Sequence, residues 1–118
     1  MDALLALGRR QEALAELETL GPDRLAQMPR GAELRVLEAE LHAERGACDR
    51  AMPLFDEALS RPSGASVEER ALFGRASCRV RLGEPDGAAA DLRRYLEHHP
   101  TGRHAESARR MLDRIGPE

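Results

Sequence analysis

Residues 76–100 read ASCRVRLGEPDGAAADLRRYLEHHP, and this stretch has the pattern of a helical hairpin. Gly83 can adopt the left-handed conformation that ends a helix. Pro85 suits the first turn of a second helix, where its missing N–H would have no partner, and Pro100 ends that helix. The apolar members of the second helix have the spacing of one helical face: Ala88, Leu92, Tyr95 and Leu96. We therefore predict two antiparallel helices that share a buried seam.

The same pattern recurs upstream, which indicates an internal repeat. Three glycines lie 38 and 37 residues apart, and each is followed after five positions by an alanine and after nine by a larger apolar residue. A period of this size is typical of stacked helical hairpins. Stacking is needed because a single hairpin cannot bury its own apolar face. The aligned sets are Gly8, Gly46 and Gly83; Ala13, Ala51 and Ala88; and Leu17, Phe55 and Leu92.

The repeat predicts the fold and its divisions. We expect an all-α solenoid of stacked antiparallel hairpins, wound as a right-handed superhelix, in one domain over residues 1–118. Its parts would be a partial repeat at 2–20, full repeats at 32–60 and 67–99, and a capping helix at 102–115. We expect a short first helix from Asp2 that ends at Gly8, which predicts that a longer protein continues upstream. Ser66 with Glu69 has the spacing of a capping box, and Thr101 is a second expected N-cap.

Composition supports helices and excludes several classes of protein. The 118 residues are rich in Ala, Leu, Glu and Arg and poor in β-branched residues, which favours helix. The net charge of -3 argues against a general nucleic-acid binder. No apolar stretch approaches the roughly 20 residues of a membrane span, so we expect no direct insertion into a membrane. No leader with a basic start and a long apolar run is visible.

The aligned glycines, alanines and large residues, together with Pro100, resemble the tetratricopeptide repeat family. The period is longer than the usual 34 residues, and the aromatic positions of the first helices hold Arg35 and Leu72. The closest similarity is to a subset found in bacterial cell-envelope proteins, which favours a periplasmic or other extracytoplasmic location over the cytoplasm. That similarity is carried by Tyr95, Leu96, Pro100, Gly102, Ala105 and Ala108.

The resemblance implies a binding groove on the concave face, formed by the first helices of successive pairs. Phe73 lies off the apolar stripe and is either an exposed anchor for a partner or a ring covered by a neighbour. Arginines such as Arg70, Arg79, Arg81 and Arg110 either bind acidic peptide termini or lie on a solvated face. The implied groove residues are Glu33, Val36, Glu40, Arg70, Phe73, Ser77, Arg103 and Arg110.

The two cysteines, Cys48 and Cys78, lack the spacing of zinc ligands. A stacked array brings the start of one second helix near the end of the next first helix, which places the two cysteines close together. They form either a disulfide that closes a loop of about 30 residues or a pair of buried thiols. The sequence leaves both readings open.

Histidines gather at the last junction of the chain, at positions 98, 99 and 104. Adjacent histidines point in different directions on a helix, and a histidine in a last turn complements the helix dipole. We therefore expect no metal site and no cofactor. A nucleophile with an adjacent base and a phosphate-binding loop are also missing from the sequence, so we do not expect an enzyme.

These observations predict a non-catalytic module that binds a peptide or protein partner on its concave face. The alternative is a structural spacer or oligomerisation domain of a larger bacterial envelope or regulatory protein. In that case, self-association would use the truncated first helix.

Overall fold

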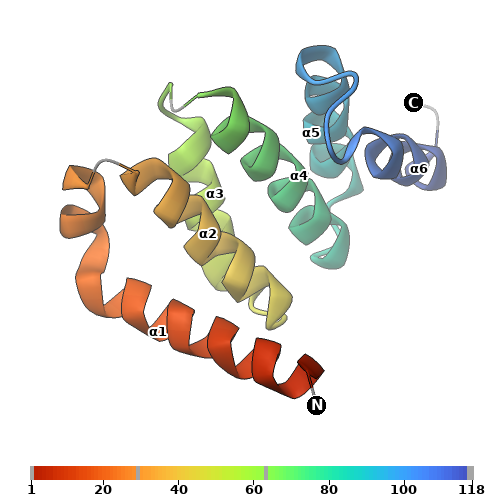
Figure 1. Cartoon of the computed structure of the whole chain (residues 1–118). Helices are drawn as coiled ribbons and strands as arrows, with labels where there is room; N and C mark the ends of the chain where they lie inside the picture. Colours follow the sequence, from red (N-terminus) through yellow and green to blue (C-terminus); the bar gives the residue numbers. More distant parts are fainter. Residues whose placement is uncertain (1, 29, 63, 117–118) are drawn as a thin grey trace.

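The computed structural model describes residues 2–28, 30–62 and 64–116, although not the side chains of residues 2–8 and 26. These residues form an all-α helical-repeat fold without β-strands, as predicted (Figure 1). The helices are α1 (Asp2–Gln27), α2 (Gly31–Glu44), α3 (Cys48–Leu59), α4 (Ala65–Arg81), α5 (Pro85–His98) and α6 (Ala105–Ile115). None of them, over the described residues, has the length and hydropathy needed to cross a lipid bilayer.

Two of the predicted hairpin turns form at glycines in the left-handed region. Gly46 has φ 81° between α2 and α3, and Gly83 has φ 77° between α4 and α5. This conformation lets the turn close onto the preceding helix: Ala47 N–H donates to the His42 carbonyl at 2.9 Å, and Glu84 N–H to the Arg79 carbonyl at 2.8 Å. A side chain at either position would strain the backbone.

The predicted break at Gly8 is wrong. α1 runs through Gly8, and its helical backbone is interrupted at Gly21, which has φ 81° and ψ 161° and is followed by Pro22. A glycine alone costs a helix only about 1 kcal/mol, and good helix formers follow Gly8. At Gly21 the next residue is proline, which cannot continue the hydrogen bonding. The first segment is therefore one long helix rather than a shortened hairpin.

The two predicted N-caps are also wrong. α4 begins at Ala65 after Gly64, so Ser66 lies inside the first turn, and no side chain caps that helix. Glu69 instead accepts hydrogen bonds from the Tyr95 hydroxyl and the Arg103 N–H. α6 begins at Ala105, four residues beyond Thr101. The Glu69 carboxylate was expected to cap its own helix. It instead binds α5 and the loop that follows α5.

The helices pack in chain order, and α2 also contacts α4 (Figure 1). The core divides into clusters at successive interfaces. Leu14, Leu17 and Leu25 pack against Leu41 between α1 and α2. Phe55 lies at the centre of the α2–α3–α4 cluster, and Tyr95 lies in the α4–α5–α6 cluster. Of the aligned repeat positions, Ala51, Phe55, Ala88 and Leu92 are completely buried.

Candidate functional site

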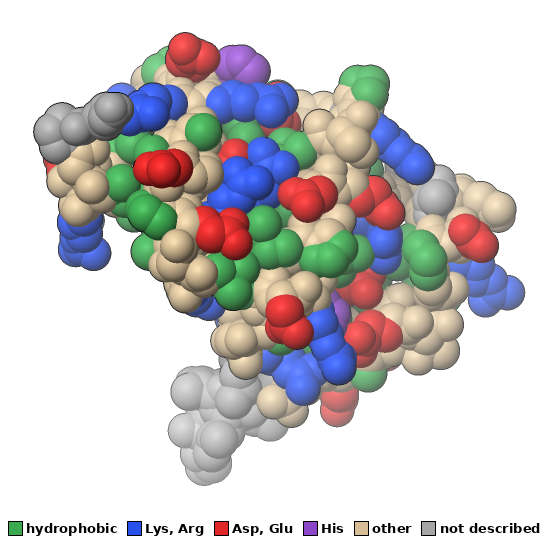
Figure 2. Space-filling view, turned by 180° about the vertical axis from the view of Figure 1, so that it is seen from behind, with side chains coloured by type: hydrophobic (Ala, Val, Ile, Leu, Met, Phe, Trp, Pro, Cys, Tyr) green, Lys and Arg blue, Asp and Glu red, His purple; other side chains and the backbone are tan. Residues whose placement is uncertain are grey.

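A groove of about 520 Å³ opens between α1, α2, α4 and the loop that precedes α6. Its floor includes Gly74, and the buried ring of Phe55 packs directly against this glycine, so that an added Cβ would overlap the ring. The lining residues are Arg9, Arg10, Ala13, Leu37, Glu40, Leu41, Ala43, Glu44, Phe55, Arg70, Phe73, Gly74, Ser77, Arg81, Arg103 and His104. Figure 2 shows the molecule from behind the view of Figure 1, and acidic and basic side chains are mixed on that side.

The groove lining is basic, with five arginines against two glutamates, a net charge of +3 with His104 neutral. Arg70 binds Glu40 with two hydrogen bonds of 3.1 and 2.5 Å, which raise the pKa of Arg70 and keep it charged. Arg10 pairs with Glu44 at 3.0 Å. The guanidinium groups of Arg9 and Arg103 form no hydrogen bond or ion pair with any residue that the structure describes.

A second cavity of about 450 Å³ adjoins the groove, because Leu37 and Arg70 line both. Its lining includes Arg30 and Glu33, which pair at 2.6 Å. The hydrogen bond from Arg30 lowers the pKa of Glu33. The full lining is Met28, Arg30, Glu33, Leu34, Leu37 and Arg70. The two cavities together form a surface along α2 and α4 that carries both apolar and charged side chains.

A family model described as tetratricopeptide repeat matches residues 70–102, which include most of α4 and all of α5. The chain carries a tetratricopeptide repeat. The family predicted from the sequence is thus confirmed, whereas the cell-envelope subset stays a prediction. Neither the curated proteins nor the solved structures contain a match to this chain. Stacked repeats of this kind present curved surfaces to other proteins, so the chain is a protein-interaction module in this general sense.

Of the eight groove residues that the repeat register implied, six line at least one of the two cavities and two line neither. Glu40, Arg70, Phe73, Ser77 and Arg103 line the groove, and Glu33 lines the adjoining cavity.

The other two positions are corrections. Val36 is completely buried in the core between α2, α3 and α4, because its face of α2 turns toward Phe55. Arg110 is exposed on α6, where its guanidinium lies 3.8 Å from Glu106, and it lines neither cavity. The register did not predict that Val36 faces the core, or that α6, which carries Arg110, lines neither cavity.

Phe73 is half-buried by a neighbouring ring rather than free in the groove. Its ring stacks on His104, with centroids 4.3 Å apart and planes at 10°, and meets Tyr95 edge-on at 6.1 Å. Of the two readings from the sequence, the covered ring is the one observed. Phe73 therefore supplies part of the groove wall and joins it to the core of the repeat.

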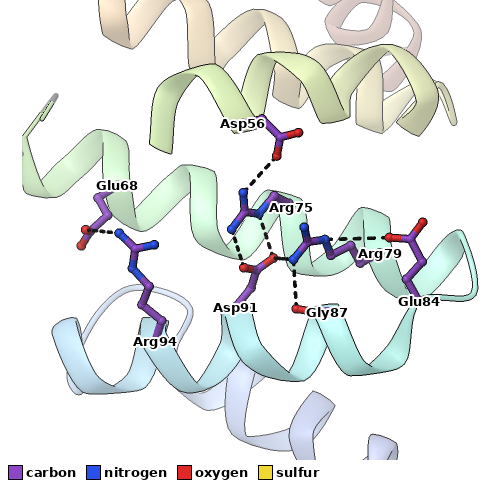
Figure 3. Close-up of polar contacts among 8 residues, drawn as sticks. All are labelled: Asp56, Glu68, Arg75, Arg79, Glu84, Gly87, Asp91 and Arg94. Atoms are coloured by element: carbon purple, nitrogen blue, oxygen red, sulfur yellow. Dashed lines mark hydrogen bonds and ion pairs between the residues drawn. The ribbon is translucent and has the colours of Figure 1, made fainter. Parts of the chain in front are cut away.

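Arg79, a candidate for binding acidic termini, faces α5 instead of the groove. It donates hydrogen bonds to Asp91 at 3.1 Å and to the Gly87 carbonyl at 3.2 Å (Figure 3). Arg75 binds the same carboxylate at 3.0 and 2.7 Å and also reaches Asp56 of α3 at 2.9 Å. This network connects α3, α4 and α5 and has a structural role in the repeat.

The histidines of the last junction meet a carboxylate. His98 Nδ1 and His99 Nε2 lie 3.1 and 2.8 Å from the same oxygen of Glu68. Burial raises the pKa of Glu68, but the hydrogen bonds from the two rings outweigh burial and lower it overall. His104 is separate, since its ring lies against Phe73.

A further titratable cluster, which the sequence did not predict, lies between α1 and α2. Glu18, Glu38 and His42 bring their potential ligand atoms within 4.8 Å of one another. The spacing of Glu38 and His42, four residues apart on one helix, was the available signal. Glu18 could not be added from the sequence because it comes from a different helix.

Cys48 and Cys78 are paired as a disulfide, with α-carbons 5.4 Å apart. The bond joins the start of α3 to the last turn of α4, and both side chains are buried. Arg81 closes this end of the interface by donating a hydrogen bond to the Ala43 carbonyl at 2.8 Å. The pairing connects the matched repeat to the hairpin before it.

Proposed function

We propose that the groove binds an acidic, extended segment of a partner protein. The observation that carries this proposal is the charge of the lining, five arginines against two glutamates. Arg9 and Arg103 have guanidinium groups without a hydrogen-bonding partner among the described residues. Charge-assisted bonds to carboxylates are the strongest that such groups form, so two acidic side chains of a ligand would satisfy both.

The apolar part of the lining supports a peptide rather than a small anion. Leu37 and Phe73, which are both half-buried, offer apolar surface among the charged positions. An extended segment that alternates acidic and apolar side chains matches this distribution, since charges give orientation while apolar contact gives affinity. The adjoining cavity at Met28 and Leu34 extends the same kind of surface.

We propose that this binding is non-catalytic. Nucleophilic catalysis requires a base within hydrogen-bonding reach of the nucleophile. Ser77 forms no such bond with His104 in the part of the chain described, and the His104 ring is stacked on Phe73.

The test uses a fluorescein-labelled peptide of alternating Glu and Leu, with a second peptide in which Gln replaces Glu. Fluorescence anisotropy is expected to show salt-sensitive binding of the acidic peptide and weaker binding of the neutral one. Arg103→Glu and Arg9→Glu should each weaken binding several-fold. Arg93→Glu is the matched control, because Arg93 is exposed on α5 and lines neither cavity.

Unchanged affinity in the Arg9→Glu/Arg103→Glu double variant, or equal binding of the two peptides, would overturn the groove proposal. Sedimentation velocity without peptide tests the alternative role. Concentration-dependent dimers together with no peptide binding would favour the spacer or oligomerisation domain.

A further inference from the structure

Glu18, Glu38 and His42 converge where α1 meets α2, and none of them lines the groove. Glu38 and His42 are four residues apart in α2, so they share one face of that helix. Glu18 approaches them from α1. The possible ligand atoms of the three side chains all lie within 4.8 Å of one another.

The imidazole of His42 is buried without a hydrogen bond. Its side chain is 4% exposed, and Nε2 lies 3.4 Å from Glu18 Oε2, beyond the roughly 2.7–2.9 Å of a charge-assisted hydrogen bond. It forms no hydrogen bond with any of the described residues. A ring nitrogen held beside two carboxylates offers the third ligand atom of a metal-binding set.

Arg35 supplies the outer contacts of this cluster. It donates a hydrogen bond of 2.9 Å to Glu38 Oε1 and binds Glu57 at 3.0 and 3.2 Å. Hydrogen bonds of this kind orient metal-ligating carboxylates. Arg61 also acts on Glu57 through its charge. With Glu18, Glu38 and Glu57 counted against Arg35 and Arg61, the group keeps a formal charge of -1, which favours a cation.

We propose that Glu18, Glu38 and His42 bind a divalent transition-metal ion of the zinc type, which fastens α1 to α2. One imidazole and two carboxylates are ligands that Zn²⁺ accepts, with water completing a tetrahedral shell. The imidazole disfavours Ca²⁺ and Mg²⁺, which prefer oxygen ligands. Because α1 packs mainly against α2, an ion held by both helices stabilises the folded arrangement and not the unfolded chain.

The experiment titrates untagged, metal-stripped protein, with its cysteines oxidised, with Zn²⁺ by calorimetry and with Co²⁺ by visible absorption. We expect one equivalent to bind and the melting temperature to rise with Zn²⁺. Glu18→Gln and His42→Gln should each weaken binding about tenfold or more. Glu18→Gln is informative even if His42→Gln fails to fold, because the Glu18 side chain is 43% exposed.

Matched controls separate this site from general surface binding. Glu16→Gln removes an exposed carboxylate of α1, and His98→Ala/His99→Ala removes the other histidine cluster. Both should retain one equivalent of metal with unchanged affinity. The proposal is overturned by the absence of saturable binding, by unchanged affinity in Glu18→Gln, or by equal weakening in Glu16→Gln.

Discussion

The hydroxyl of Tyr95 donates a hydrogen bond of 2.5 Å to Glu69, although the two residues are 26 positions apart. The same hydroxyl accepts the His104 N–H at 2.8 Å, and the same carboxylate oxygen accepts the Arg103 N–H at 2.6 Å. One side-chain pair therefore joins α4, α5 and the loop that enters α6. That loop also carries two groove residues, so the pair fixes one wall of the binding surface.

Tyr95→Phe keeps the buried ring and removes the hydroxyl. We expect the free energy of unfolding to fall by about 1–3 kcal/mol, because Glu69 and the His104 N–H each lose a partner. Urea denaturation measures this loss. Ser107→Ala, which removes an exposed hydroxyl on α6, should change stability by about 0.5 kcal/mol or less, and a similar effect of both substitutions would contradict the prediction.

The phenol of Tyr95 should lose its proton at a higher pH than an exposed tyrosine does. Burial first, and then the hydrogen bond to Glu69, raises the pKa of Tyr95 to about 12 from an ordinary value of 10. The chain has a single tyrosine, so phenolate absorbance against pH reports this group alone. The folded state holds the phenol proton of Tyr95 more tightly than the unfolded chain does. The resulting contribution to folding stability is complete below pH 10 and is lost as pH rises through about 12.

Two comparisons check this titration. In urea the pKa should return toward 10, and Glu69→Gln should lower the native pKa because the nearby negative charge is gone. A native pKa that is equal to the value in urea would show that the hydroxyl is not held as described.

Gly102→Ala should be destabilising although Gly102 lies in a loop. An added Cβ would lie 2.5 Å from Glu69 Oε2 and 2.7 Å from the Tyr95 hydroxyl. Displacing this hydrogen-bonded pair should cost about 1–3 kcal/mol, measured by urea denaturation. Thr101→Ala is the neighbouring control. In the Tyr95→Phe background, Gly102→Ala should lower the free energy of unfolding by less, because one of the two clashing atoms is absent. Full additivity of the two losses in stability would argue against the clash.

The disulfide should stabilise the chain. Reduction of Cys48–Cys78, which are separated by 30 residues, should lower the free energy of unfolding by about 3–4 kcal/mol, mainly because the unfolded chain becomes less restricted. Urea denaturation with and without reductant measures this change, and Cys48→Ala/Cys78→Ala should not respond to reductant. Intact mass after alkylation of unreduced, denatured protein is the direct check. Two labelled thiols in air-oxidised protein would disprove the bond.

The carboxylate of Asp91 should contribute more to the stability of the fold than any exposed acidic side chain on α5. It is 4% exposed and is shared by Arg75 and Arg79 (Figure 3). Asp91→Asn removes the buried charge that two arginines share, while Arg75 keeps Asp56 and Arg79 keeps a more distant contact with Glu84. Loss of one partner of a buried pair costs about 3–5 kcal/mol. Thermal and urea unfolding measure the loss. Glu97→Gln, an exposed residue of the same helix, should have almost no effect, and comparable losses would contradict this role.

The helices themselves were largely predictable because their signals are local. Gly46 and Gly83 end helices at the expected positions, and the buried seam follows the repeating alanine and large apolar residue. The same local reasoning failed at Gly8, because a glycine alone does not end a helix. It failed at Ser66 with Glu69 because the local pattern does not contain Tyr95 and Arg103, which bind Glu69. Of the residues that the repeat register implied, Glu40, Arg70 and Arg103 line the groove. Which face of a helix points into the groove depends on how the neighbouring helices pack, and the local sequence does not contain this information.

The sequence by itself determined a chain of α-helices in repeating hairpins, because glycine turns and apolar periodicity act over a few residues. The tertiary structure alone decided which side chains meet across helices. It buried Val36, stacked Phe73 on His104, gave Glu69 to Tyr95, and brought Glu18 to Glu38 and His42. Such contacts depend on the crossing and rotation of whole helices, which the packing of the full core sets.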